Sequence, residues 1–277
     1  MNALEAILIA ILQGATELFP VSSLGHAVVL PAVVGSGLNE RGPEFLPFLV
    51  MLHLGTAAAL LLYFWRDWWS LAVGILGAGS QHEVSESRRV FGLIVIATIP
   101  AVIVGFLLEK FVRTLFGSPV VAAVFLVVNG FVLLLGERLR TRGQRPLSSL
   151  KPMDALVIGC WQCLALIPGL SRSGSTIVGG LLRGINHEGS AHFSFLIATP
   201  IILGATVLEV PKLLHSSVPS GVFELSVLAA VVAGVTAFAS TAFLMKYFRD
   251  NDRWALNPFA YYCFVVGAGS LAILLIR

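Results

Sequence analysis

Residues 13–26 read QGATELFPVSSLGH and form a polar break between two apolar arms, 3–12 and 27–34. Each arm holds roughly ten residues, about half of the roughly 20 that an α-helix needs to cross a bilayer. Half-length arms around a polar turn predict a re-entrant helical hairpin. Because non-helical backbone at membrane depth is tolerated only where protein or a wet cavity surrounds it, this break is a candidate site.

A second stretch of the same form lies in the other half of the chain. Residues 168–176 read PGLSRSGST, between an apolar arm over 153–167 and another over 177–185. The sequence therefore predicts two re-entrant hairpins, each with a polar break at its tip.

Six further segments are apolar and close to the roughly 20 residues that span a bilayer. They are 46–65, 90–108, 119–135, 191–210, 222–245 and 258–276. Only 12% of the residues are charged, whereas a soluble domain carries about 25%. We therefore predict an all-α polytopic membrane protein with six transmembrane helices plus two re-entrant helical hairpins. The net charge of +3 is too small for a nucleic-acid partner. The low share of charged residues makes the lipid bilayer the expected surroundings of the protein.

The order of these elements repeats along the chain. A shift of 149 positions aligns 21–26 (VSSLGH) with 170–175 (LSRSGS), although a chance match of so few identities is the alternative. One hairpin followed by three spans occurs twice, and a half with an odd number of crossings forces the second half to enter the membrane upside down. We expect a single membrane domain over 1–277, an inverted repeat of halves near 1–149 and 150–277, with its site near the midplane.

Lys and Arg are unequally divided between the two predicted sides of the membrane. Twelve lie on the side of the loop 137–151 and five on the other, while Arg172 is left inside. Because short cytoplasmic loops carry an excess of these residues, the loop side is expected to be the cytoplasm. Both termini are then expected outside.

The first break carries groups suited to proton transfer. Gln13 and Glu17 are four residues apart, so they share a face of a helix. A carboxylate inside an apolar segment usually lines a pathway or a site. Ser22 or Ser23 is expected to cap the second arm, with His26 in its first turn. The alternative is a serine-capped surface helix with a solvated Glu17.

The second break carries groups suited to an anion. Arg172 is expected at the start of a half-helix, where free N–H groups and the helix dipole favour negative charge. Its guanidinium fork suits pairs of phosphate oxygens. Four hydroxyls surround it, from Ser171, Ser173, Ser175 and Thr176. The alternative is an arginine that snorkels to the headgroups.

The two breaks together predict a phosphoryl-transfer site inside a membrane. The second set binds phosphate and stabilises charge on the transferring group. The first set supplies proton transfer or a nucleophile. A substrate that reaches such a site is expected to have a lipid tail. A secondary transporter or lipid flippase is the alternative function, because inverted repeats with broken helices also build transporters.

Residues 17–26 (ELFPVSSLGH) and 168–176 (PGLSRSGST) resemble the two motifs of the undecaprenyl-diphosphate phosphatase, or bacitracin-resistance, family. The likeness covers nearly the whole chain. It implies hydrolysis of undecaprenyl diphosphate to undecaprenyl phosphate and inorganic phosphate, which recycles the lipid carrier for cell-wall synthesis. It also implies a bacterial inner-membrane protein whose site faces the periplasm and depends on a divalent cation, Mg²⁺ or Ca²⁺.

By position, the resemblance implies a role for each residue of the motifs. Glu17 would be a metal ligand or general base, and Arg172 the phosphate clamp. Ser22 or Ser23 would be a phosphate ligand or nucleophile, and His26 a base or nucleophile. A phospho-enzyme intermediate and direct attack by water both stay open.

The chain has a neutral residue at one position of the first motif that is usually acidic. The motif is usually Glu-x-x-x-Glu, with Gln also accepted at its first position, where Gln13 stands, so only Glu17 carries charge there. This weakens any scheme with two carboxylates on one metal ion. Gln13 is expected beside the phosphates, where it can orient a water or a metal-bound ligand, and the remaining phosphate contacts are expected from Ser171, Ser173, Ser175 and Thr176. The preferred lipid length stays open, as does homo-oligomer formation.

Two polar residues, His53 and Asn129, lie within predicted spans. Helices in lipid use such groups to bond to one another, so we interpret both as helix-packing residues rather than ligands. Cys160 and Cys163 are spaced like a redox pair, but they lack the βαβ context of one, and we interpret them as small apolar residues.

Overall fold

The computed structural model describes residues 3–35, 45–115, 118–140, 145–215 and 220–276, and every regular element within them is helical. The side chains of 45–47, 109, 112–113, 205, 208–215, 220 and 222 fall outside this description. The helices are α1 (Ala3–Thr16), α2 (Ser23–Val34), α3 (Phe45–Tyr63), α4 (Trp65–Ile75), α5 (Gln81–Leu115), α6 (Pro119–Leu139), α7 (Pro152–Gln162), α8 (Arg172–Leu182), α9 (His187–His215), α10 (Ser220–Asp250) and α11 (Asn257–Ile276), with short 3₁₀ turns at Leu147–Ser149 and Cys163–Leu166.

Four helices in the described part of the chain, α5, α6, α10 and α11, are long and apolar enough to cross a membrane. A fifth candidate is the pair α3 and α4, which is bent by 76°. The bend falls where apolar α3 gives way to the sequence WRDWW at 65–69. Indole and charged groups favour the membrane–water interface, which accounts for a bend at this point. The sixth predicted span, 191–210, lies in α9 and ends among side chains outside the description. The all-α class is confirmed, and the chain is a multi-pass membrane protein.

Both predicted hairpins consist of short α-helices on either side of a break in the α-helical backbone, and the second break includes the 3₁₀ turn Cys163–Leu166. The break between α1 and α2 ends at Ser22, whose hydroxyl accepts the N–H of Gly25 at 3.2 Å. The break between α7 and α8 ends at Ser171, whose hydroxyl accepts the N–H of Gly174 at 3.1 Å. A serine therefore caps the second helix of each hairpin.

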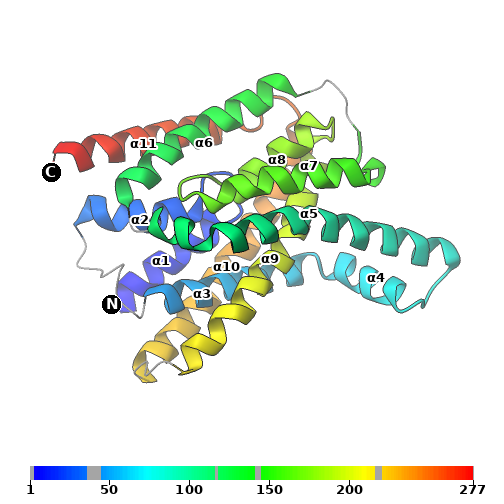
Figure 1. Ribbon diagram of the computed structural model, residues 1–277, viewed down its shortest axis with the longest axis horizontal. Coiled ribbons are helices and arrows are strands. Elements are labelled where there is room, and N and C mark those ends of the chain that lie inside the picture. Colours follow the sequence, from blue (N-terminus) through cyan, green and yellow to red (C-terminus); the bar gives the residue numbers. More distant parts are fainter. Residues whose placement is uncertain (1–2, 36–44, 116–117, 141–144, 216–219, 277) are drawn as a thin grey trace.

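Each hairpin packs against a long helix of the other half of the chain (Figure 1). Helix α1 lies against α10, and α7 lies against α5. Glycines allow the close approach that helices in lipid favour: a Cβ on Gly14 would lie 2.3 Å from the Ala233 carbonyl oxygen, and one on Gly159 would lie 2.4 Å from that of Ala97. The inverted repeat and its boundary near residue 149 stay a prediction.

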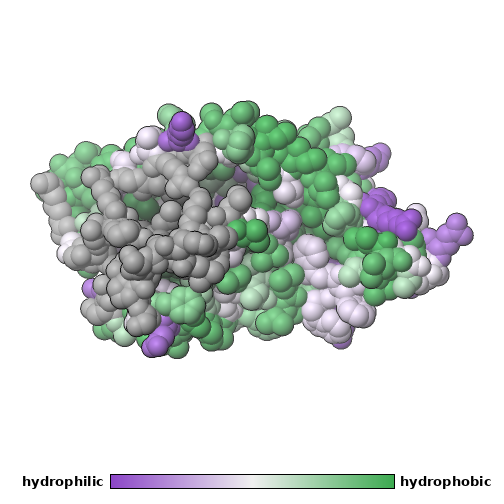
Figure 2. Space-filling model, turned by 60° about the horizontal axis from the view of Figure 1, so that its bottom comes forward, coloured by the Kyte–Doolittle hydropathy of each residue, from purple (hydrophilic) through white to green (hydrophobic). Residues whose placement is uncertain are grey.

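Apolar residues cover much of the face in Figure 2, while hydrophilic residues gather mainly at one end. Asp154 joins two loops by accepting hydrogen bonds from Arg145 at 2.9 Å and Arg183 at 2.7 Å. Arg142, which the charge count assigns to the same side, lies outside the described residues, as does Arg41 of the opposite side. The described ion pairs around Asp154 thus tie α7 to the end of α8.

Candidate active site

Glu17 is the centre of a cluster that joins the two hairpins. It follows the last residue of α1 and is buried. Its Oε2 accepts hydrogen bonds from the Gln13 amide at 2.9 Å and from the Ser23 hydroxyl at 2.6 Å. Its Oε1 accepts one from Arg172 Nη2 at 3.2 Å. The acidic residue of the first break and the basic residue of the second are therefore in direct contact.

His53 of α3 also belongs to this cluster. Its Nε2 lies 3.6 Å from Glu17 Oε2 and 3.2 Å from the Gln13 amide nitrogen. Its Nδ1 lies 2.8 Å from the Leu49 carbonyl oxygen. Because a carbonyl only accepts, Nδ1 carries the hydrogen, and Nε2 of the neutral ring accepts from Gln13. The interpretation of His53 as a residue that bonds one helix to another agrees with its contact with Gln13 of α1. It did not indicate that this contact lies in the candidate site, because the only sequence signal is a histidine inside an apolar span.

Arg172 is the first residue of α8 and is held from α9. Its Nη1 donates to the Ser194 carbonyl at 3.5 Å. Thr176 bonds the Arg172 carbonyl at 2.8 Å and the Ser194 hydroxyl at 2.6 Å. Nothing in the motifs indicated Ser194, which reaches the site only because α9 packs on α8.

Three of the four hydroxyls around Arg172 bond to protein groups. Thr176 does so as above, and Ser173 donates to the Phe19 carbonyl at 3.0 Å. Ser171 lies 3.4 Å from that same oxygen. Ser175 is buried and has no hydrogen-bond partner in the described part of the chain. Ser171 and Ser173 therefore join one break to the other. Among these four residues, Ser175 is the one whose hydroxyl has no partner in the described part of the chain.

His26 has contacts of a different kind. Its Nδ1 lies 2.7 Å from the Ser22 carbonyl oxygen, and its Nε2 lies 2.9 Å from the Tyr262 hydroxyl of α11. The ring also stacks on Tyr262 with centroids 5.6 Å apart. Ser22 itself has a left-handed backbone, with φ 68°. The described contacts of His26 thus support the turn before α2 rather than reach Glu17 or Arg172.

The tips of the two hairpins touch, so the starts of α2 and α8 lie close together. A Cβ on Gly25 would lie 3.0 Å from Gly169 Cα, and one on Gly174 would lie 3.2 Å from Pro20 Cβ. Gly169 has φ +98°, a left-handed conformation that favours glycine. Two helix N-termini beside one guanidinium form a favourable place for an anion.

The donors around Glu17 fit a hard cation only in part. Within the described residues, no three His, Cys, Asp or Glu side chains lie together as a metal-binding group. Gln13 Oε1 is nevertheless buried beside Glu17 without a hydrogen-bond partner. Carboxylate and amide oxygens suit Mg²⁺ or Ca²⁺, and Mg²⁺ commonly takes one or two carboxylates plus substrate phosphates. Glu17 and Gln13 therefore fit a cation whose remaining ligands come from a diphosphate.

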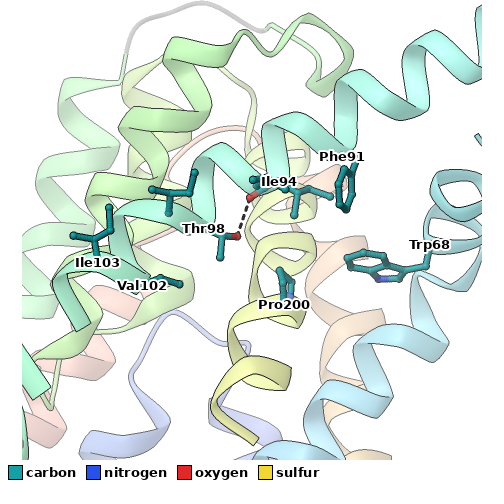
Figure 3. A pocket seen from close by; sticks show the side chains of 9 residues that line it. Trp68, Phe91, Ile94, Thr98, Val102, Ile103 and Pro200 are labelled. Atoms are coloured by element: carbon teal, nitrogen blue, oxygen red, sulfur yellow. Dashed lines mark hydrogen bonds between the residues drawn. The ribbon is translucent and has the colours of Figure 1, made fainter. Parts of the chain in front are cut away.

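A separate apolar groove of about 330 Å³ opens between α4, α5 and α9 (Figure 3). It is lined by α5 residues from Phe91 to Ile103 together with Trp68 and Pro200. The hydroxyl of Thr98 in its wall already bonds the Ile94 carbonyl at 2.8 Å. The groove contains none of the predicted site residues, and its wall suits hydrocarbon rather than phosphate.

Comparison with known proteins shows similarity along nearly the whole chain. Residues 6–269 match the family described as Bacitracin resistance protein BacA. The undecaprenyl-diphosphatase of Granulibacter bethesdensis is 65% identical over 98% of this chain and 97% of its own length. That of Acidiphilium cryptum is 57% identical over 99% of both chains. That of Mycobacterium avium is 39% identical over 100% of this chain and 99% of its own.

Proposed function

We propose, since the chain belongs to the bacitracin resistance protein BacA family, that it is an integral membrane phosphatase acting on undecaprenyl diphosphate. The products are undecaprenyl phosphate and inorganic phosphate, and the reaction returns the lipid carrier to cell-wall synthesis. The observation that carries the proposal is the contact of Arg172 and Ser23 with the same buried carboxylate, Glu17.

Arg172 is the phosphate clamp of this mechanism. Its guanidinium exchanges Glu17 for oxygens of the terminal phosphate, with support from the N–H groups at the start of α8. The exchange releases Glu17 Oε1 from its ion pair, and Oε2, which accepts the Ser23 hydroxyl, takes the proton. The same donors stabilise charge on the transferring group, which is the main requirement of phosphoryl transfer.

Ser23 is the nucleophile that the contacts favour. Its hydroxyl lies 2.6 Å from Glu17 Oε2, whereas the Ser22 hydroxyl caps α2 and both His26 nitrogens have other partners. Glu17 takes the hydroxyl proton while the Ser23 oxygen bonds to the terminal phosphorus. The bond from that phosphorus to the bridging oxygen breaks, and Glu17 returns the proton to the leaving lipid phosphate.

Water completes the reaction by the reverse proton path. Glu17 takes a proton from a water that attacks the phosphoserine, the phosphorus–Ser23 bond breaks, and the serine regains its proton. In the competing scheme, Glu17 activates water directly against the diphosphate. Acid-quenched enzyme with substrate labelled in its terminal phosphate separates the two: we expect label on wild type and none on Ser23→Ala. Wild-type turnover by Ser23→Ala would establish direct attack by water.

We further propose a divalent cation, Mg²⁺ or Ca²⁺, held by Glu17 and Gln13 Oε1 together with the diphosphate. When bound, it supplies Lewis-acid stabilisation of phosphate charge. Gln13→Glu adds a second carboxylate at this position, so we expect half-maximal activity at about tenfold less cation. An unchanged cation requirement in Gln13→Glu would remove Gln13 from the proposed ligands.

Purified protein in detergent with a polyprenyl diphosphate tests the overall assignment. We expect wild type to release inorganic phosphate, and we expect Arg172→Ala and Glu17→Ala to release almost none. Wild-type rates in either variant would overturn these roles. A transporter or flippase on the same scaffold would bind the lipid without releasing phosphate, so the assay also decides between the two functions.

We propose the bacterial inner membrane as the location, with the site facing the periplasm and both termini outside. The unequal distribution of Lys and Arg supports this orientation. Tags at both termini of the protein in intact cells should react with an impermeant reagent. Protection of either tag would reverse the orientation.

A further inference from the structure

Asn129 of α6 connects the two hairpin tips through one side chain. It is fully buried. Its Nδ2 donates to the Pro20 carbonyl at 2.9 Å, and its Oδ1 accepts the N–H of Ser171 at 2.9 Å. Because a carbonyl only accepts and an N–H only donates, these two partners fix the orientation of the amide. The second hydrogen of Nδ2 points to Cys263 Sγ at 3.3 Å.

These two partners occupy sensitive positions in the chain. Pro20 lies midway between Glu17 and Ser23, which bond to each other, and Ser171 directly precedes Arg172. Both backbone groups lie in breaks, where no helix supplies them with a partner. A displacement of the Asn129 amide would therefore alter the separation of the carboxylate from the guanidinium.

Close packing on both sides prevents α6 from moving away from the breaks. A Cβ on Gly169 would lie 2.4 Å from the carbonyl oxygen of Ala122, on one face of α6. A Cβ on Gly130 would lie 2.9 Å from the Ala260 carbonyl oxygen of α11. Helix α6 is thus closely packed between the second break and α11, and Asn129 projects from it toward both breaks.

We propose that Asn129 is a positioning residue of the phosphatase, which holds Arg172 in register with Glu17 and Ser23 without touching the substrate. An asparagine suits this role because its short planar amide presents a donor and an acceptor together. The inference rests on the proposed function and adds a residue that belongs to neither motif.

The first test compares two buried amides. Asn129→Ala should lower kcat by about a hundredfold, since misplacement of about 1 Å can reduce a rate to that extent, with a much smaller change in KM. Gln162→Met is the matched control: Gln162 is also buried and bonds the Ala97 carbonyl at 3.2 Å, but makes no described bond to either break. We expect Gln162→Met to keep the wild-type kcat per folded molecule, with folding of both variants measured by thermal unfolding in detergent.

The second test is rescue by acid. The neutral side chain of Asn129→Asp can donate to Pro20 and accept from Ser171, whereas its carboxylate can only accept. The rate of Asn129→Asp relative to wild type at the same pH should therefore rise as the pH falls. Among the described residues, Cys263 is the titratable side chain that bonds Asn129. Asn129→Asp combined with Cys263→Ala should keep this rise.

The outcomes distinguish this inference from the proposed function. An Asn129→Ala kcat within threefold of wild type, or a flat ratio for Asn129→Asp, overturns the positioning role while an inactive Arg172→Ala leaves the function intact. Loss of stability in Asn129→Ala with unchanged kcat per folded molecule also overturns it. A fully active Arg172→Ala defeats the proposed function first.

Discussion

Two buried glutamates, Glu17 and Glu137, have partners of the same kinds, although only Glu17 belongs to the candidate active site. Each contacts one arginine and one histidine. The arginine distances are nearly equal, 3.2 Å at Glu17 and 3.3 Å at Glu137. The histidine lies farther from Glu17, at 3.6 Å, than from Glu137, at 2.9 Å. An arginine and a histidine beside a carboxylate therefore do not by themselves make a catalytic site.

The remaining partners separate the two glutamates. Glu137 accepts the backbone N–H groups of Trp254 at 3.0 Å and Leu256 at 3.2 Å, which ties the loop between α10 and α11 to α6. Glu17 accepts a hydroxyl and an amide from side chains of its own hairpin. Backbone groups are fixed in the fold, whereas side chains rotate away when a ligand arrives. The contacts of Glu137 therefore hold the loop in place, and we call them a structural lock. The contacts of Glu17 can be exchanged for those of a ligand.

The strongest test of this contrast removes the charge of Glu17. Glu17→Gln keeps the size of the side chain but removes the proton acceptor, and general acid–base groups contribute roughly 10²–10⁴-fold to a rate. We expect phosphate release to fall by about that factor. Thermal unfolding in detergent should show a smaller loss of stability than in Glu137→Gln, and the opposite order would reverse our distinction between lock and site.

Glu137→Gln should instead act on stability. Removal of one partner from a buried ion pair costs about 3 kcal/mol or more, here from the contacts with Arg140, His187 and two loop amides. We expect a lower free energy of unfolding by chemical denaturation, with an unchanged rate of phosphate release per folded molecule. A variant that is stable but inactive would assign Glu137 to catalysis.

Sequence alone predicted the hairpins and the meeting of their tips, because half-length apolar arms around Pro, Ser and Gly leave few alternatives. It did not separate His53 from Asn129, since each is a single polar residue in an apolar span. Only packing decides that one reaches Glu17 and the other bonds both breaks. Nor did it indicate the lock at Glu137, because nothing local shows that a loop more than a hundred residues later supplies its partners.

Asp154, outside the membrane-spanning helices, extends the comparison to pH. Burial raises the pKa of its carboxyl, but bonds from Arg183, the Lys151 N–H and Arg145 outweigh burial and hold the pKa below its usual 3.8. A lowered pKa in the folded state means that this stabilisation is complete above pH 3.8 and is lost as the pH falls through the folded value. Wild type should therefore be more stable than Asp154→Asn near neutral pH.

The difference between these two proteins should shrink below about pH 3.8, as measured by thermal unfolding of both in the same detergent. Phosphate release at neutral pH should be equal per folded molecule, because the described bonds of Asp154 go to Arg145, the Lys151 N–H and Arg183, none of which lies in the candidate site. A constant difference in stability across the acid range would show that the Asp154 carboxylate contributes nothing through its charge.

Tyr262→Phe is expected to have the smallest effect, and it tests whether the support of His26 matters to the site. His26 Nδ1 donates to the Ser22 carbonyl, so neutral Nε2 accepts from the Tyr262 hydroxyl, and the substitution removes that one bond while the rings stay stacked. A hydrogen bond contributes roughly 0.5–1.5 kcal/mol, which corresponds to about two- to tenfold in rate. Tyr261→Phe, at the exposed neighbouring position, is the control. Equal rates in the two variants would mean that the turn before α2 holds Ser23 in place without help from the Tyr262 hydroxyl of α11.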